Sequence, residues 1–275
     1  MSMFIRTNTS SLEAQRQLSR SSMEQSKVFQ RLSSGYRINS AADDAAGLGI
    51  TESMNAQLRS FAVSERNAMD GISMAETADG ASSQIHEILS RLRELAVQSS
   101  NGALQAGDRT NLNTEFTTMR AEIDRISNVT QFNGINLLSG ASNNVDFQVG
   151  INTTVDDHVT VAFGGVSSTA LAINASAVDT VANSQTAIND LDAAIAAMST
   201  RREGFGASIN RLQASVSNIQ SMKTNLAGAH SRIKDVDVAS ESASMAKLQV
   251  LTQAGATVLQ QANQAPQLAL SLLKG

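Results

Sequence analysis

The sequence contains one stretch that begins like a metal-dependent catalytic motif, His86-Glu87-Ile88-Leu89-Ser90. Zinc proteases place two histidines four residues apart on one helical face, with a glutamate beside the first as general base. Ser90 stands here where the second imidazole is required, and a single histidine cannot chelate the metal. The other two histidines, His158 and His230, have no partner at ligand spacing. We therefore expect no metal site.

Two pairs of acidic residues, Asp43 with Asp44 and Asp235 with Asp237, could serve as acid and base in catalysis. Local structure explains them more simply. Gly35 can end one helix with a positive φ, and Ser40 followed by Asp43 is a capping-box pattern that begins the next. The chain has no cysteine and no Gly-rich phosphate loop ending in Lys-Ser or Lys-Thr. The sequence therefore predicts a protein that is not an enzyme and needs no cofactor.

The composition of the 275-residue chain favours long helices over compact mixed layers. Only 3% of its residues are aromatic, with one Pro and no Trp, although 41% are hydrophobic. The net charge of -4 gives no reason to expect a nucleic-acid partner. No window approaches the ~18 continuous apolar residues of a membrane span, and the first residues lack the apolar core of a secretory signal peptide. If the protein leaves the cell, we expect a dedicated export machine.

The clearest helical pattern lies in the C-terminal third, where apolar residues alternate at steps of three and four. They are Ile188, Leu191, Ile195, Met198, Phe205, Ile209, Leu212, Val216, Ile219, Leu226 and Ile233. Arg202, Lys223 and His230 fill the positions of this seam that lack an apolar residue. A seam over so many heptads predicts one helix packed lengthwise on partners, reaching roughly 68 Å at 1.5 Å per residue.

Two shorter stretches upstream have the same spacing and supply the partners of this helix. They are Met74, Ala78, Ala81, Ile85, Ile88, Leu92 and Leu95, and then Leu112, Phe116, Met119, Ile123 and Ile126, with Gly102 and Gly107 as breakers between them. We predict a mainly α fold, a long antiparallel coiled-coil-like bundle formed by both ends of the chain. Its predicted rod core comprises Ile85, Ile88, Leu92, Leu112, Phe116, Met119, Ile123, Ile195, Phe205, Ile209, Leu212, Val216 and Ile219.

The middle of the chain has the period of strands. Asn133-Gly134 tolerates the positive φ of a tight hairpin turn, and apolar residues alternate with polar ones over 145–151 and 159–163. We expect a small β-hairpin region here. The domains expected are a rod of 45–140 and 178–233, the β region 141–177 within it, and a terminal domain of 1–44 and 234–275.

The two ends carry apolar residues that a single chain cannot bury. Each end is a moderate amphipathic helix, and isolated short helices are marginal in water. The stripes imply burial against copies of the same chain or a chaperone. The residues expected to drive assembly are Phe4, Ile5, Leu12, Leu18, Phe29, Leu32, Met245, Leu248, Leu251, Val258, Leu259, Leu268 and Leu272.

Several sequence blocks resemble those of bacterial flagellins and stand in the same order. They cover both terminal thirds of the chain. The blocks are Arg31-Leu32-Ser33-Ser34-Gly35-Tyr36-Arg37-Ile38-Asn39-Ser40-Ala41-Ala42-Asp43-Asp44-Ala45-Ala46-Gly47, Arg66-Asn67-Ala68-Met69-Asp70-Gly71-Ile72-Ser73, Leu92-Arg93-Glu94-Leu95-Ala96-Val97-Gln98-Ser99, Thr130-Gln131-Phe132-Asn133-Gly134, Ser231-Arg232-Ile233-Lys234-Asp235-Val236-Asp237, Gln253-Ala254-Gly255-Ala256-Thr257-Val258-Leu259-Gln260-Gln261-Ala262-Asn263-Gln264 and Leu270-Ser271-Leu272-Leu273.

The resemblance implies a structural subunit of the extracellular flagellar filament, with its terminal helices in an inner tube and its rod in the surrounding shell. It implies secretion by the flagellar type III apparatus, a chaperone that holds about 235–273, and contact with cap and hook-associated junction proteins. The sequence departs from larger members at 141–180, which is too short for variable outer domains. A hook–filament junction protein, which has similar terminal helices, stays the alternative.

The resemblance also implies recognition of the rod by a Toll-like receptor of animal hosts. The family's receptor contacts correspond to Arg91, Leu95 and Glu115. Thr118 stands where better-known stimulating members have Gln, so the strength of this recognition does not follow from the sequence.

Overall fold

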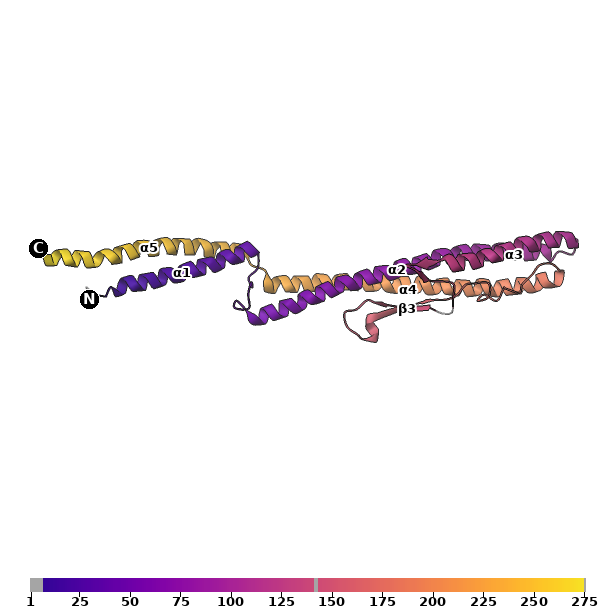
Figure 1. Cartoon of the computed structure of the whole chain (residues 1–275), viewed down its shortest axis with the longest axis horizontal. Coiled ribbons are helices and arrows are strands. Elements are labelled where there is room, and N and C mark those ends of the chain that lie inside the picture. The colour runs from indigo at the N-terminus through magenta and orange to yellow at the C-terminus, as the bar shows by residue number, and fades with distance from the viewer. Residues whose placement is uncertain (1–6, 141–142, 275) are drawn as a thin grey trace. The chain divides into compact units, whose positions relative to one another are not determined.

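The structure, a computed structural model, describes residues 7–140 and 143–274, with the side chains of 265–274 outside the description. Its elements are α1 (Thr9–Ser34), α2 (Ala45–Ser99), α3 (Ala106–Val129), β1 (Gln131–Phe132), β2 (Ile135–Asn136), β3 (Asn143–Gln148), the 3₁₀ turn η1 (Val155–Asp157), β4 (His158–Phe163), α4 (Val181–Lys234) and α5 (Val238–Lys274) (Figure 1). The predicted mainly α fold with β-hairpins in the middle is confirmed. No helix in the described ranges is long and apolar enough to cross a membrane.

Tertiary contacts divide the chain into two compact units. One unit combines Met1–Ala56 with Asn225–Gly275, and the other is the continuous segment Gln57–Thr224. The first therefore joins the two ends of the chain, and the second contains both hairpins. We call them the terminal unit and the rod unit and describe each separately.

The core of the rod unit is built from α2, α3 and α4. On α4 five residues at intervals of seven are almost completely buried, namely Leu191, Met198, Phe205, Leu212 and Ile219. Ile85 and Leu92 of α2 and Phe116 and Ile123 of α3 are also fully buried, whereas the predicted core residues Ile88, Leu112, Met119, Ile195, Ile209 and Val216 are half-buried and pack against this core. From Met198 onward the heptad spacing leads to one fully buried position per two turns, and before it Ala187 and Ala194 add a second.

Ion pairs occupy two of the three seam positions of α4 that lack an apolar side chain, Arg202 and Lys223. Nε of Arg202 lies 2.8 Å from a carboxylate oxygen of Asp79, and Nζ of Lys223 lies 2.6 Å from Oε2 of Glu65. The Lys223 and Gln220 side chains donate hydrogen bonds to Glu65 and lower the pKa of this carboxyl below its ordinary value. These pairs join α2 to α4 in antiparallel order.

Both hairpins are antiparallel. β1 and β2 are joined by Asn133 and Gly134, whose φ values of 48° and 78° confirm the turn expected from the sequence. β3 pairs with β4, so that Val145 lies opposite Val161 and Phe147 opposite Val159.

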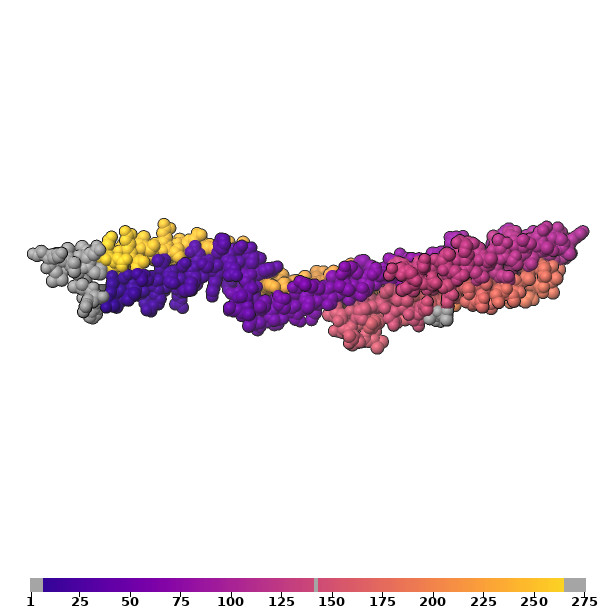
Figure 2. All heavy atoms as spheres, in the orientation of Figure 1, coloured from indigo at the N-terminus to yellow at the C-terminus, as the bar shows by residue number. Residues whose placement is uncertain are grey.

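The β3–β4 hairpin docks on α2 (Figure 2). The Ser64 hydroxyl donates to the Gly150 carbonyl at 2.8 Å, and the Asn67 amide donates to the Gln148 carbonyl at 3.1 Å. Gly71 is buried, and a methyl group added there would lie 3.0 Å from Phe147 and 3.1 Å from Leu212. This glycine therefore allows the hairpin to approach the helix closely.

The segment 164–180 is irregular but well packed, which the sequence pattern did not predict. Val166, Leu171, Ile173 and Val178 lie in the core of the rod unit. Two side chains of α3 hold the segment: Asp124 accepts hydrogen bonds from the amide and hydroxyl of Ser168, and Asn113 accepts one from the amide of Val178. Polar groups of a helix therefore take the place of a regular strand partner here.

Candidate self-assembly surface

Helices α1 and α5 pack against each other as an antiparallel pair in the terminal unit. At one end, Asn8 donates to the Ala262 carbonyl at 2.8 Å, and the Ser11 hydroxyl donates to Oδ1 of Asn263 at 2.7 Å. At the other end, Arg31 lies 3.5 Å from a carboxylate oxygen of Glu241. Asn8 also caps α1, because its side chain accepts a hydrogen bond from the Ser11 amide.

Small and polar side chains form much of the seam between α1 and α5. The α1 positions that face α5 recur at heptad spacing and are Ser11, Ala14, Leu18, Ser21, Gln25, Val28 and Leu32. Gly255 of α5 faces Leu18, and a methyl group added to this glycine would lie 3.4 Å from the leucine, at van der Waals contact. Leu18, Val28 and Leu32 are the only large apolar residues among these α1 positions, so less than half of them contribute a large apolar side chain to the interface.

Large apolar side chains lie instead on the outside of the pair. Leu12, Met23 and Phe29 of α1 are 54%, 60% and 66% exposed, and Val250, Leu251 and Val258 of α5 are also exposed. Of the other residues expected to drive assembly, Leu18, Leu32, Met245 and Leu259 are half-buried and Leu248 is buried in the pair. Phe4 and Ile5 lie outside the described residues, as do the side chains of Leu268 and Leu272.

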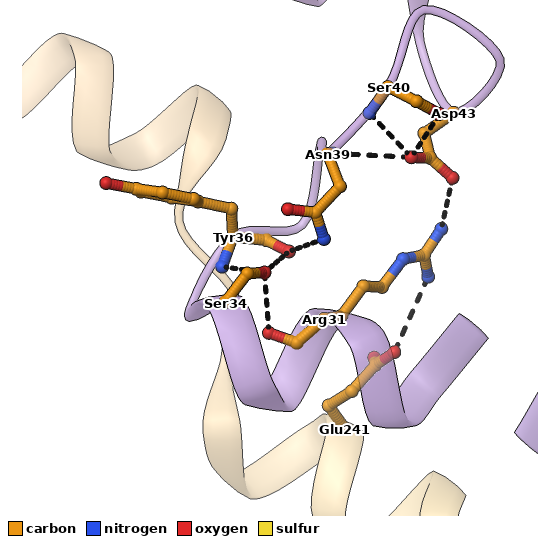
Figure 3. Close-up of polar contacts among 7 residues, drawn as sticks. All are labelled: Arg31, Ser34, Tyr36, Asn39, Ser40, Asp43 and Glu241. Atoms are coloured by element: carbon orange, nitrogen blue, oxygen red, sulfur yellow. Dashed lines mark hydrogen bonds and ion pairs between the residues drawn. The ribbon is translucent and has the colours of Figure 1, made fainter. Parts of the chain in front are cut away.

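The connection from α1 to α2 is fixed by a polar network around Arg31 and Asp43 (Figure 3). Arg31 lies between two acids, 3.7 Å from Asp43 and 3.5 Å from Glu241. The hydroxyl and amide of Ser40 both donate to Asp43 at 3.0 Å, and these bonds, with the guanidinium nearby, lower the pKa of the Asp43 carboxyl. Gly35, which ends α1 with φ of 75°, begins this connection as expected.

The expected capping box at Ser40 and Asp43 needs a correction. The two residues close a turn of their own, and α2 begins only at Ala45. Asp44 caps the helix, because its Oδ1 accepts a hydrogen bond from the Gly47 amide at 2.8 Å. The physical reason is that Asp43 is already engaged by Ser40 and Arg31 (Figure 3).

A second set of contacts joins this connection to the chain between α4 and α5. The Arg37 amide donates to the Lys234 carbonyl at 2.7 Å, and the Val236 amide donates to the Gly35 carbonyl at 3.0 Å. The ammonium of Lys234 lies 5.2 Å from the centre of the Tyr36 ring, within cation–π range. The two short connections of the terminal unit therefore hold each other in place.

The residues expected to contact a receptor lie in the rod unit and differ in exposure. Arg91 forms ion pairs with Glu94 at 2.9 Å and with Glu115 at 3.0 Å, and the side chains of Arg91 and Glu115 are 46% and 42% exposed. Leu95 is fully buried in the core instead. The expectation that Leu95 offers a surface contact is therefore wrong for the folded chain, because its side chain packs in the helical seam.

The acidic and histidine residues that could have served in catalysis or metal binding have surroundings that point to structural roles. Asp237 accepts hydrogen bonds from the amides of Ala239 and Ser240 at the start of α5. His86 stands alone on α2 as a ligand candidate, since the described part of the chain contains no group of three or more His, Cys, Asp or Glu residues that could hold a metal ion.

Comparisons with known proteins match both ends of the chain. The family profile of the bacterial flagellin N-terminal helical region matches residues 5–143, and that of the bacterial flagellin C-terminal helical region matches 188–273. The flagellin of Halalkalibacterium halodurans is 40% identical over 272 residues, which cover 99% of this chain and 100% of that protein. The flagellar filament 33 kDa core protein of Treponema phagedenis is 38% identical, with coverage of 99% and 100%.

A solved structure agrees with these matches. The crystal structure of Bacillus cereus flagellin is 30% identical, with a TM-score of 0.50 over 60% of this chain and 94% of that one. Only residues 144–187 lie between the two matched regions, which leaves no room for a large variable domain. The chain therefore belongs to the bacterial flagellins, the structural, non-enzymatic proteins of the flagellar filament, and is a short form of them.

Proposed function

We propose that this chain polymerises into the filament through its α1–α5 pair, as a helical homopolymer that serves swimming motility. The observation that carries the proposal is the distribution of side chains on the pair. Its seam combines serines, a glutamine and a glycine with Leu18, Val28, Leu32 and Leu248, whereas Leu12, Met23, Phe29 and Val258 remain exposed outside it. Copies of the same chain can cover these side chains, and a contact between two different surface patches of identical subunits builds an open helical filament when its rotation does not close a ring.

The proposal includes the route by which the subunit reaches the filament. The exposed apolar residues of α5, among them Val250 and Val258, would also allow subunits to associate inside the cell. A chaperone bound over about 235–273 keeps them covered before the unfolded chain is exported by the flagellar type III apparatus. The filament then grows outside the cell by addition of subunits beneath a cap protein, and its base rests on hook-associated junction proteins.

Deletion of residues 245–275 tests the self-assembly proposal. The truncated chain is expected to stay soluble and helical in its rod unit, since the core of that unit uses none of the deleted residues. It is expected to form no filaments by electron microscopy. The matched control is Val155→Ser in the full chain, which changes a side chain that is 89% exposed in the rod unit and should polymerise normally. Filaments of the truncated chain would refute the proposal.

The alternative function, a hook–filament junction protein, differs in the number of copies per flagellum. Quantitative mass spectrometry of isolated flagella should find this chain in thousands of copies per filament. A single ring of copies beside another abundant flagellin would favour the junction role.

We further propose that a Toll-like receptor of animal hosts reads the rod unit at Arg91 and Glu115. The two side chains are exposed and lie 3.0 Å apart, so they offer one polar patch from two helices. Purified monomer should stimulate reporter cells, and Arg91→Ala should weaken the signal. Arg125→Ala is the control, since Arg125 forms a similarly exposed pair with Glu122. A folded monomer that gives no signal would end this proposal.

A further inference from the structure

A groove runs along one flank of the α1–α5 pair. It has a volume of about 340 Å³, and its apolar lining comes from Val28 of α1 and Leu248 and Leu251 of α5. Val28 and Leu248 are held in the seam, each 8% exposed, while Leu251 is 44% exposed. Charged side chains of both signs, including Glu24 and Lys27, line its edges. The groove therefore has an apolar floor and a charged rim, in which Glu24 and Glu241 stand beside Lys27, Arg31 and Lys247.

Phe29 projects from the opposite flank of the same pair. The seam of α1 repeats every seven residues, so Glu24 and Arg31, which line the groove, each precede a seam residue directly. Phe29 instead directly follows the seam residue Val28. In a heptad these two kinds of position flank the seam on opposite sides. The side chain is 66% exposed, so Phe29 is an apolar protrusion facing away from the groove.

The surroundings of Phe29 suit the groove electrostatically. Its neighbours one helical turn away on α1 are Gln25, Ser26, Leu32 and Ser33, and none of them carries a charge. This flank therefore brings no ionised group into the groove that would lose its hydration without a partner. The charged rim can stay at the edge, in water, while the phenyl ring covers the apolar floor.

We propose that Phe29 of one copy inserts into the α1–α5 groove of the next copy. Because the protrusion and the groove lie on opposite flanks, each copy that receives a Phe29 still presents its own. Such a contact is heterologous, the class of contact that builds an open helical polymer when the rotation between copies does not close a ring. This inference rests on the proposed self-assembly function and names the contact between the copies.

Cysteine cross-linking tests the contact, since the natural chain has no cysteine. The variant with both Phe29→Cys and Leu251→Cys is assembled and then oxidised. We expect a ladder of covalent dimers, trimers and larger species on a denaturing gel. Each single-cysteine variant should give no species above a dimer, and unassembled double variant should give no ladder. Filaments of the double variant that show no ladder would overturn the inference.

A second measurement covers the case in which the cysteine variants do not assemble. Phe29 replaced by p-benzoylphenylalanine keeps the aromatic ring, and light should attach it to the segment Ser244–Leu251 of another copy. Attachment to any other segment, or only to a bound chaperone, contradicts the proposed occupant. Phe29→Ser should raise the critical concentration for assembly about 10- to 100-fold, the factor expected for burial of one phenylalanine side chain.

The outcomes separate this inference from the proposed function. If Phe29→Ser assembles at the wild-type concentration while the 245–275 deletion does not assemble, the groove contact is wrong and self-assembly through the terminal helices stands. If the deletion also forms filaments, the proposed function itself fails. Val155→Ser again serves as the control, since it removes an apolar residue of the rod unit that is even more exposed, 89% against 66% for Phe29.

Discussion

Gly71→Ala and Leu212→Ala, separately and combined, test how closely α2, α4 and the β3–β4 hairpin pack. Leu212 is fully buried, so its truncation should cost about 2–5 kcal/mol of unfolding free energy. The methyl group of Gly71→Ala would meet Phe147 at 3.0 Å and Leu212 at 3.1 Å. Overpacking of this kind costs about 1–3 kcal/mol, against about 1 kcal/mol gained in helix propensity. The single Gly71→Ala variant should therefore be slightly destabilised.

The two changes should compensate for each other in the double variant. Removal of the Leu212 side chain takes away one of the close contacts and opens space into which the Phe147 ring can shift. The propensity gain of Gly71→Ala then remains while most of the clash is relieved. We expect a favourable coupling of about 1–2 kcal/mol, within the range found for contacting residues.

Thermal unfolding of the four full-length proteins, followed by far-UV circular dichroism, measures this coupling. One kcal/mol corresponds to roughly 2–4 °C in Tm for a unit of this size. Gly80→Ala is the control for Gly71→Ala, because nothing lies within 4 Å of its added methyl group. It should be stabilising to the same extent with and without Leu212→Ala. If Gly71→Ala and Leu212→Ala were additive within about 0.5 kcal/mol, the packing argument would be refuted.

Three further predictions concern single side chains. Ile209→Ala should cost less stability than Leu212→Ala, since Ile209 is only half-buried, and equal losses in Tm would contradict the observed orientation of α4. Gly35→Ala should destabilise the terminal unit by about 1 kcal/mol, because the φ of Gly35 is 75°, in the left-handed region. The control Gly49→Ala, within α2, should be neutral or stabilising. Hydrogen exchange of the α1 amides measures the difference in stability between the two variants. The pKa of Glu65 is lowered in the folded chain from its ordinary value of 4.5, so its stabilising contribution is complete above about that pH and is lost as the pH falls through the lower folded value. Glu65→Gln should therefore reduce the dependence of Tm on pH below 4.5, and an unchanged acid profile would argue against the ion pair with Lys223.

The helices of the rod unit were predictable because their burial is periodic. The seam residues Leu191, Met198, Phe205, Leu212 and Ile219 recur at a spacing that solvent exclusion alone imposes on a long helix. The same periodicity also included Leu95, and the structure buries it as the spacing indicated. The wrong expectation for Leu95 came from the family resemblance. The resemblance assigns the role of receptor contact by position in the sequence and does not depend on the exposure of the side chain in this chain.

Features that depend on distant partners were not predictable. The segment 164–180 has no period, and its order comes from side chains of α3 such as Asp124 and Asn113, far away in the sequence. Similarly, the local sequence pattern allows either Asp43 or Asp44 to cap α2. Asp44 caps the helix, whereas Asp43 forms an ion pair with Arg31, which lies outside this local pattern. The heptad seam of α1 was not predictable from apolar spacing, because Ser11, Ser21 and Gln25 occupy seam positions and are not apolar.

The strict interval of seven on α4 limits how the length of this protein can change. Inserting or removing one residue between Leu191 and Ile219 would rotate one half of the helix by about 100° relative to the other, and would turn buried side chains toward water. Changes of seven residues keep the phase, but they also require a matching change in α2 to preserve pairs such as Arg202 with Asp79. Growth or loss of sequence is therefore tolerated far more easily in the turn between β3 and β4, where Val155 lies in water, than within either long helix.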